Sequence, residues 1–180
     1  MAGVRPIDSA IKKFYMSVVG TIVATVPFWI WIGLYHGGLN VAFVVSTFFS
    51  ILMAVVVLEF ARRRPAKATL SWGEAMVAAM FAFFFMFFVY GIWPHQWLIW
   101  ADNEMNWRPD YFLVGPGGIL DFLPFTLHYT LLRDLIAVVI YGLGLAAHVA
   151  LFVIWQNRGD EAKSTDLETT TTYGRPLQKA

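Results

Sequence analysis

The most constraining feature of this chain is the length of its charge-free runs. No Asp, Glu, Lys or Arg occurs in residues 14–58, 75–101 or 135–157. A charged side chain at the centre of a membrane helix costs about 2.5 to 3.5 kcal/mol, so a bilayer selects runs of this kind. A spanning helix needs roughly 17 to 25 residues, and four apolar segments meet that length: 15–35, 41–58, 75–93 and 135–155. We therefore predict an all-α integral membrane protein with four transmembrane helices.

Composition excludes several other classes of protein. Apolar residues make up 58% of the chain and charged residues 14%, whereas soluble domains average about 45 to 50% and about 25%. The net charge of +1 gives no indication of a nucleic-acid partner. Since the chain has no Cys, it has no disulfide, thiolate metal site or iron–sulfur cluster. The expected solvent is the lipid bilayer.

The distribution of Lys and Arg predicts the orientation. All of the 13 Lys and Arg residues except Arg108 and Arg133 lie in residues 1–14, in the connection 59–74 or in the polar tail 156–180. Four spans place these three regions on one side of the membrane. Because cytoplasmic loops carry the excess of positive charge, we predict cytoplasmic termini in a plasma or inner membrane. The chain then divides into a cytoplasmic segment 1–14, a transmembrane domain 15–155 and a flexible cytoplasmic tail.

Small residues follow one face of two predicted helices. They are Gly142, Ala146 and Ala150 in the fourth segment and Ala75, Ala78, Ala79 and Ala82 in the third. In lipid, small residues let helix backbones approach closely. We favour packing of these faces within the chain's own bundle, while docking onto another subunit remains open.

The outer connection 94–134 is long and rich in aromatic residues. Connections of this length are usually functional or disordered, and this composition does not suit disorder. The tryptophans are Trp93, Trp97 and Trp100, which share one helical face, and Trp107. With Pro94 at its start, this segment predicts a short interfacial helix whose tryptophans anchor the loop or contact a partner. Residues 119–127, interrupted by Pro124, predict a second interfacial or partly re-entrant piece.

The same connection holds side chains that could bind a metal. The candidates are His95, Asp102, Glu104 and His128. Imidazole and carboxylate groups suit zinc, copper and iron. Their spacing matches no known metal-binding pattern, so a metal site is the weaker alternative here.

His148 lies within the fourth apolar segment. An ionisable residue at membrane depth is a functional candidate, and imidazole can ligate a haem or hydrogen-bond a quinone. A haem held by two His needs a second His at similar depth, whereas the other three lie outside the predicted spans. A haem or quinone shared with a partner subunit stays open. The favoured alternative is a neutral, structural His148 hydrogen-bonded across the bundle.

The chain also contains the segments Arg108-Pro109-Asp110-Tyr111-Phe112-Leu113 and Tyr129-Thr130-Leu131-Leu132-Arg133. Both are similar to short elements in the C-terminal half of cytochrome b, with Asp110 where that family has Glu. The similarity ends with these segments because the surrounding helices do not match. It assigns neither a family nor a quinol-binding residue.

These observations favour a supporting role over a catalytic one. The chain has no phosphate loop, nucleophile elbow or zincin motif. We therefore expect an accessory or structural subunit of a multisubunit membrane complex, with other integral membrane subunits as partners. The favoured setting is an energy-transducing, electron-transfer complex. The alternatives are a subunit of a membrane metalloenzyme that uses the outer His and carboxylate side chains, and a small carrier or channel.

Overall fold

The computed structural model describes residues 6–65 and 68–158. Within this part of the chain, four long helical rods run up and down, and each is long and apolar enough to cross a membrane. The rods are α1 (Pro6–Tyr35), α2 (Val41–Arg63), the continuous run of α3 (Trp72–Phe87), η1 (Phe88–Ile92) and α4 (Trp93–Asn103), and α5 (Tyr129–Asn157). The predicted multi-pass helical fold is therefore confirmed. Residues 159–180 of the predicted tail lie outside the described residues.

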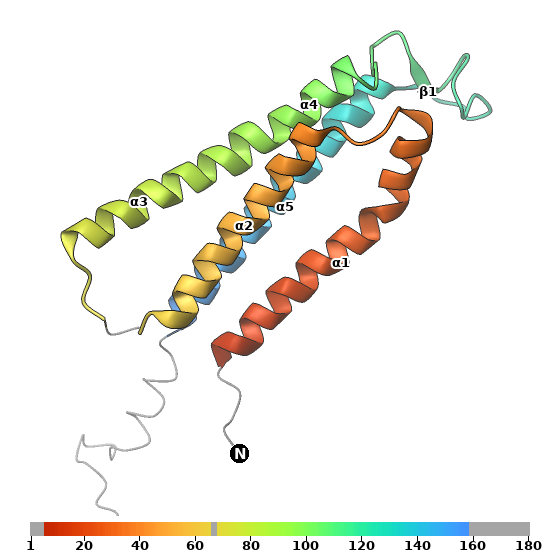
Figure 1. Ribbon diagram of the computed structural model, residues 1–180. Coiled ribbons are helices and arrows are strands. Elements are labelled where there is room, and N and C mark those ends of the chain that lie inside the picture. Colours follow the sequence, from red (N-terminus) through yellow and green to blue (C-terminus); the bar gives the residue numbers. More distant parts are fainter. Residues whose placement is uncertain (1–5, 66–67, 159–180) are drawn as a thin grey trace, which may run out of the picture.

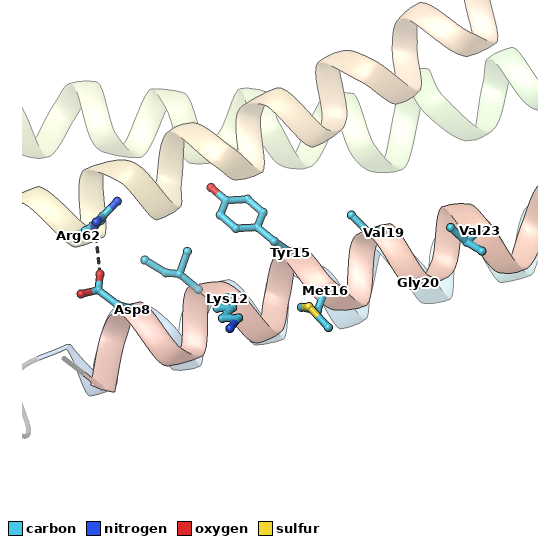
Figure 2. A pocket seen from close by; sticks show the side chains of 9 residues that line it. Asp8, Lys12, Tyr15, Met16, Val19, Gly20, Val23 and Arg62 are labelled. Carbon is cyan, nitrogen blue, oxygen red and sulfur yellow. Dashed lines mark ion pairs between the residues drawn. The ribbon is translucent and has the colours of Figure 1, made fainter. Parts of the chain in front are cut away.

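The two ends of the bundle differ, and we name them accordingly. At the basic end, α1 and α3 begin while α2 and α5 finish (Figure 1). This end carries Arg62, Arg63 and Arg64, and Asp8 of α1 pairs with Arg62 at 3.1 Å (Figure 2). At the cap end, α4 finishes beside the start of α5 and the loop that contains β1 (Figure 1). The start of α1 and the end of α5 thus lie at the same end of the molecule.

All four rods are longer than the apolar segments predicted from the sequence. The extra turns contain charged side chains that pair with one another. In α2, Glu59 lies 3.7 Å from Arg62 and 3.5 Å from Arg63, and such pairs support a helix at its exposed end. α5 begins at Tyr129, so residues 129–134 belong to the helix and not to the outer connection. α1 likewise includes most of the segment that we had separated as N-terminal.

Two glycines shape the short connection between α1 and α2. Gly37 and Gly38 both have positive φ angles, +84° and +108°, a backbone conformation that glycine adopts without steric cost. Asn40 then caps α2, because its side-chain oxygen accepts a hydrogen bond of 2.9 Å from the Phe43 N–H. The two helices run antiparallel (Figure 1).

The third rod differs from the prediction of a separate interfacial helix. α4 continues directly from α3 through the π-helical turn η1, in which the Trp93 N–H donates to the Phe88 carbonyl five residues earlier. Pro94 has no N–H and its ring would clash with the carbonyl four residues before it in a regular α-helix. A wider turn immediately before Pro94 relieves this clash. The helix therefore continues through Pro94 without a break, and α4 is not a separate helix that begins there.

α3 and the predicted small-residue faces make little contact within the chain. Of the residues of α3, all of which the structure describes, only Phe85 is buried. Ala78, Ala79 and Ala82 are exposed, as are Gly142 and Ala146 of α5. The close approach on α5 is at Gly144, where an added Cβ would lie 2.8 Å from Val89 Cγ1. Our preference for packing of the Gly142 and Ala146 face within this bundle was wrong, because the helix turns Gly144 inward instead.

The outer connection is shorter than predicted and contains a small sheet. β1 (Phe112–Val114) pairs antiparallel with β2 (Leu127–His128), with Phe112 opposite His128 and Val114 opposite Leu127. Between the strands, residues 115–126 form turns and bends. The second piece predicted at 119–127 is therefore not helical. The Tyr129 N–H donates to the Tyr111 carbonyl at 3.1 Å, which ties the loop to the start of α5.

Candidate functional site

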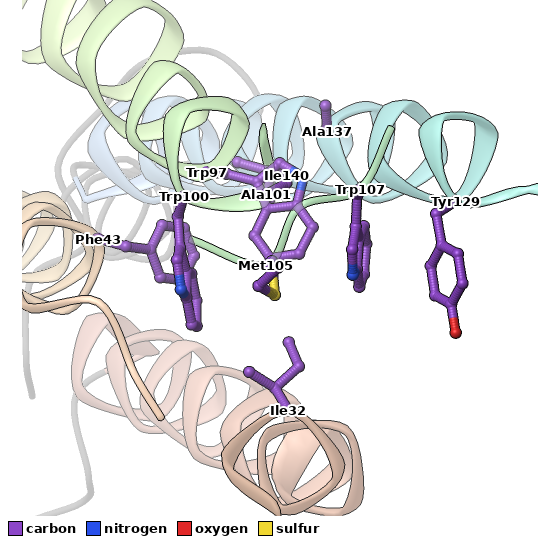
Figure 3. Packing of buried hydrophobic residues seen from close by; sticks show 10 residues of the cluster. All are labelled: Ile32, Phe43, Trp97, Trp100, Ala101, Met105, Trp107, Tyr129, Ala137 and Ile140. Atoms are coloured by element: carbon purple, nitrogen blue, oxygen red, sulfur yellow. The ribbon is translucent and has the colours of Figure 1, made fainter. Parts of the chain in front are cut away.

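A cluster of aromatic side chains fills the cap end. We define the aromatic cap as Trp97, Trp100 and Trp107 together with the residues packed on them: Ile32, Phe43, Met105 and Tyr129. Figure 3 shows side chains from α4 and the following loop pointing between α2, α5 and Ile32 of α1. Trp97 and Trp100 are 0% exposed and Trp107 is 2% exposed. The three largest fully buried side chains among the described residues therefore lie at one end of the bundle.

The rings of the aromatic cap are in specific contact. Trp29 of α1 stacks on Trp100 with ring centroids 6.1 Å apart and planes 4° apart. Trp97 meets Trp100 and Trp107 edge-on, at 5.8 and 5.7 Å. Stacked and edge-on pairs contribute about 0.5 to 1.5 kcal/mol each beyond burial. α1 reaches this cluster after Pro27, which lies inside the helix, and Figure 1 shows the helix changing direction before its end.

Polar bonds join α4 to both of its neighbours. The Trp93 indole N–H donates to Thr47 Oγ1 of α2 at 2.8 Å, and the Trp97 indole N–H donates to the Arg133 carbonyl of α5 at 2.9 Å. The Arg133 guanidinium bridges Asp102 at 2.5 Å and Asp134 at 2.7 Å. In lipid, hydrogen bonds between helices replace part of the hydrophobic driving force that water would supply. These bonds therefore fix α4 against α2 and α5.

The tryptophans do not occupy the exposed positions that we expected of anchors. Trp97, Trp100 and Trp107 are enclosed by their own chain, and Trp93 is half-buried with its indole N–H already bonded. The single helical face was predicted correctly, but it points into the bundle. None of these four tryptophans therefore exposes its whole ring to a partner.

The structure separates the predicted metal ligands. Asp102 pairs with Arg133, and Glu104 accepts a hydrogen bond from the Asn40 side chain. His128 Nδ1 lies 2.7 Å from the Pro109 carbonyl, and His95 is exposed. Among the described residues, no group of three or more His, Asp or Glu side chains lies close enough to hold a metal ion. The geometry thus gives the metal alternative no support.

Several buried polar atoms in and around the aromatic cap have no partner among the described residues. They are His36 Nε2, Trp100 Nε1, Trp107 Nε1 and Thr130 Oγ1. His36 contacts Trp31, Trp107 and Tyr129 edge-on, with ring centroids 5.0 to 6.1 Å apart. Its burial lowers its pKa, which favours the neutral imidazole with one acceptor nitrogen. Buried polar groups of this kind are commonly satisfied by ordered water. Apart from the two glycines that follow His36, nothing in the sequence indicated this environment.

His148 has a defined environment within α5. Its Nδ1 lies 2.9 Å from the Gly144 carbonyl and 3.4 Å from the Tyr90 hydroxyl. Because a carbonyl can only accept, the bond to Gly144 places a proton on Nδ1. Nε2 is buried without a partner in the part of the chain described. The ring packs on Phe85 and Tyr90 at 4.5 and 5.2 Å. This arrangement leaves one ring nitrogen of His148 available inside an apolar helix.

No protein-family model, curated protein or solved structure matches this chain. The sequence located His148 but not its contacts Gly144 and Tyr90, and it located the tryptophans but not the direction of their face. No sequence pattern indicated Thr47, which accepts a hydrogen bond from the Trp93 indole N–H.

Proposed function

We propose that this chain is a non-catalytic integral-membrane subunit of a multisubunit membrane complex. The observation that carries the proposal is the outward small-residue face of α5. Gly142 and Ala146 are exposed, and a Cβ added at Gly142 would meet nothing within 4 Å. Since small residues are enriched where helices approach in lipid, a face of this kind suits a second helix. The exposed Ala78, Ala79 and Ala82 of α3 add a similar face.

We place the basic end in the cytoplasm of a plasma or inner membrane. In support, Arg62, Arg63 and Arg64 lie at the same end as the start of α1 and the end of α5 (Figure 1), whereas Arg108 follows α4 at the other end. Cysteines introduced into this Cys-free chain at Asn103 and Ser164 should label from opposite faces of the membrane. Labelling of both by an impermeant outside reagent contradicts this orientation.

The favoured setting is an energy-transducing, electron-transfer complex. Its support is His148, an imidazole within α5 whose Nε2 is buried without a partner among the described residues. If the role of His148 is structural, His148→Gln should leave the optical spectrum of the purified complex unchanged, because an amide replaces one imidazole hydrogen bond. Loss of a haem band from a fully assembled complex would instead assign His148 to a haem shared with a partner.

The subunit role is tested by native purification in a gentle detergent. Wild-type protein should migrate with other integral membrane proteins, and Gly142→Leu should release them. Gly33→Leu in α1 is the matched control, since an added Cβ there also meets nothing within 4 Å. A wild-type protein that runs alone, or equal retention of partners by both variants, overturns the proposal. Metal analysis and a flux assay in liposomes test the metalloenzyme and the carrier or channel alternatives on the same preparation.

A further inference from the structure

An open groove runs along one face of α1 at the basic end. It has a volume of about 580 Å³, and Arg62 of α2 closes one side. Figure 2 shows Asp8 and Arg62 paired at one end of the groove, with Val19 and Val23 further along the helix. A Cβ added at Gly20 would meet nothing within 4 Å, so this part of the groove is open space.

The groove is charged at its entrance and apolar along its length. Arg62 is paired with Asp8 at 3.1 Å and with Glu59 at 3.7 Å, whereas Lys12 is exposed and forms no ion pair with any other described residue. Beyond Lys12 the lining becomes apolar: Tyr15, Met16, Val19, Gly20 and Val23. A matching ligand has a negatively charged head and an apolar tail.

The length of the apolar part of the groove favours an acyl chain over a transmembrane helix of a partner. From Lys12 to Val23 the helix advances about 16 Å, at about 1.5 Å per residue. The hydrocarbon core of a bilayer is about 30 Å thick, so one leaflet is about 15 Å deep. A transmembrane helix of a partner would contact α1 through both leaflets, whereas an acyl chain occupies one. The groove therefore has the depth of a lipid tail.

We propose that this groove binds one acyl chain of an anionic phospholipid, with the headgroup phosphate at Lys12 and Arg62. Lys12 supplies the unpaired positive charge, and the Arg62 guanidinium has donors left after its carboxylate contacts. Basic pockets between helices on the cytoplasmic side of membrane proteins bind anionic headgroups in this manner. The proposal is independent of the subunit role, because it concerns α1 and not the outer faces of α3 and α5.

The test is lipid binding by the purified full-length protein, followed by native mass spectrometry with phosphatidylglycerol or phosphatidylcholine of the same chain length. Wild-type protein should retain phosphatidylglycerol preferentially. Lys12→Gln should weaken that binding about fivefold, which corresponds to the roughly 1 kcal/mol expected for one basic residue near an anionic lipid. Lys13→Gln is the matched control, because Lys13 is the next residue and does not line the groove.

A second pair of variants tests the tail. Gly20→Leu should fill the groove and reduce retention of both lipids, whereas Gly33→Leu should not. Far-ultraviolet circular dichroism and the unfolding temperature establish that each variant is folded. Equal binding of the two lipids, equal effects of Lys12→Gln and Lys13→Gln, or retention unchanged by Gly20→Leu would each overturn the proposal. So would a co-purified helix that crosslinks along Met16 and Val19 in place of lipid.

Discussion

The same residue type has opposite surroundings at the two ends of this molecule. Trp100, in the aromatic cap, is 0% exposed, whereas Trp72, at the start of α3, is 89% exposed. Lipid tails are as apolar as a protein core, so exposure of an indole to them carries no large penalty. The burial of Trp100 must therefore result from further interactions within the aromatic cap. Indole N–H bonds, an arginine between two carboxylates and stacked rings hold α4 in place. Among the described residues, the polar side-chain bonds of α3 are confined to its start, at the Ser71 cap and the pair of Glu74 with Arg64.

The largest expected effect is loss of a ring from the aromatic cap. Trp100→Ala should lower the free energy of unfolding by about 3 to 5 kcal/mol, because it leaves a large cavity among rings that cannot collapse. Trp72→Ala should change it by less than about 0.5 kcal/mol. Reversible unfolding in mixed micelles measures both. Equal losses would show that the two ends are not energetically different.

The next effect concerns the close approach of α5 to η1. Gly144→Ala places a methyl group 2.8 Å from Val89 Cγ1, and valine has little freedom to turn away within a helix. The expected loss is about 1 to 3 kcal/mol. Gly142→Ala should be neutral or slightly stabilising, since alanine favours helix and the site is open. If Gly142→Ala were the more damaging change in the isolated protein, the inward face of α5 would be misassigned.

The smallest effect is a dependence of the cap on pH. Burial lowers the pKa of His36 from its ordinary value of about 6.5. The unfolded chain therefore binds more protons than the folded one in mild acid, so the stability is fully present above pH 6.5 and decreases as the pH falls through the folded pKa. The unfolding temperature followed from pH 8 to pH 5 should show this decrease. His36→Phe should reduce it, whereas replacement of the exposed His95 by Gln should not.

Much of the fold could be predicted from the sequence because a bilayer imposes simple rules. Charge-free runs located every rod. The direction of the tryptophan face could not be predicted. Lipid and protein interior are equally apolar, so the spacing of Trp97 and Trp100 is the same whether their face points to the lipid or into the bundle. The inward position of Gly144 could not be predicted for the same reason. The pairing of the metal candidates could not be predicted either, because Asp102 and Glu104 are bonded to Arg133 and Asn40, which are distant in the sequence.

The π-helical turn η1 makes chain length itself a structural determinant. Each residue of an α-helix advances the rod by about 100° and about 1.5 Å. Because a π-helical turn holds one more residue than an α-helical turn, the five residues Phe88–Ile92 turn the rod about as far as four residues of regular α-helix would. Deleting one residue here would therefore let the rod run as regular α-helix from Trp72 while Trp97 and Trp100 keep facing inward. The same deletion within α3 has no extra residue to remove, so all of α4 would rotate by about 100° about the axis and turn these tryptophans outward.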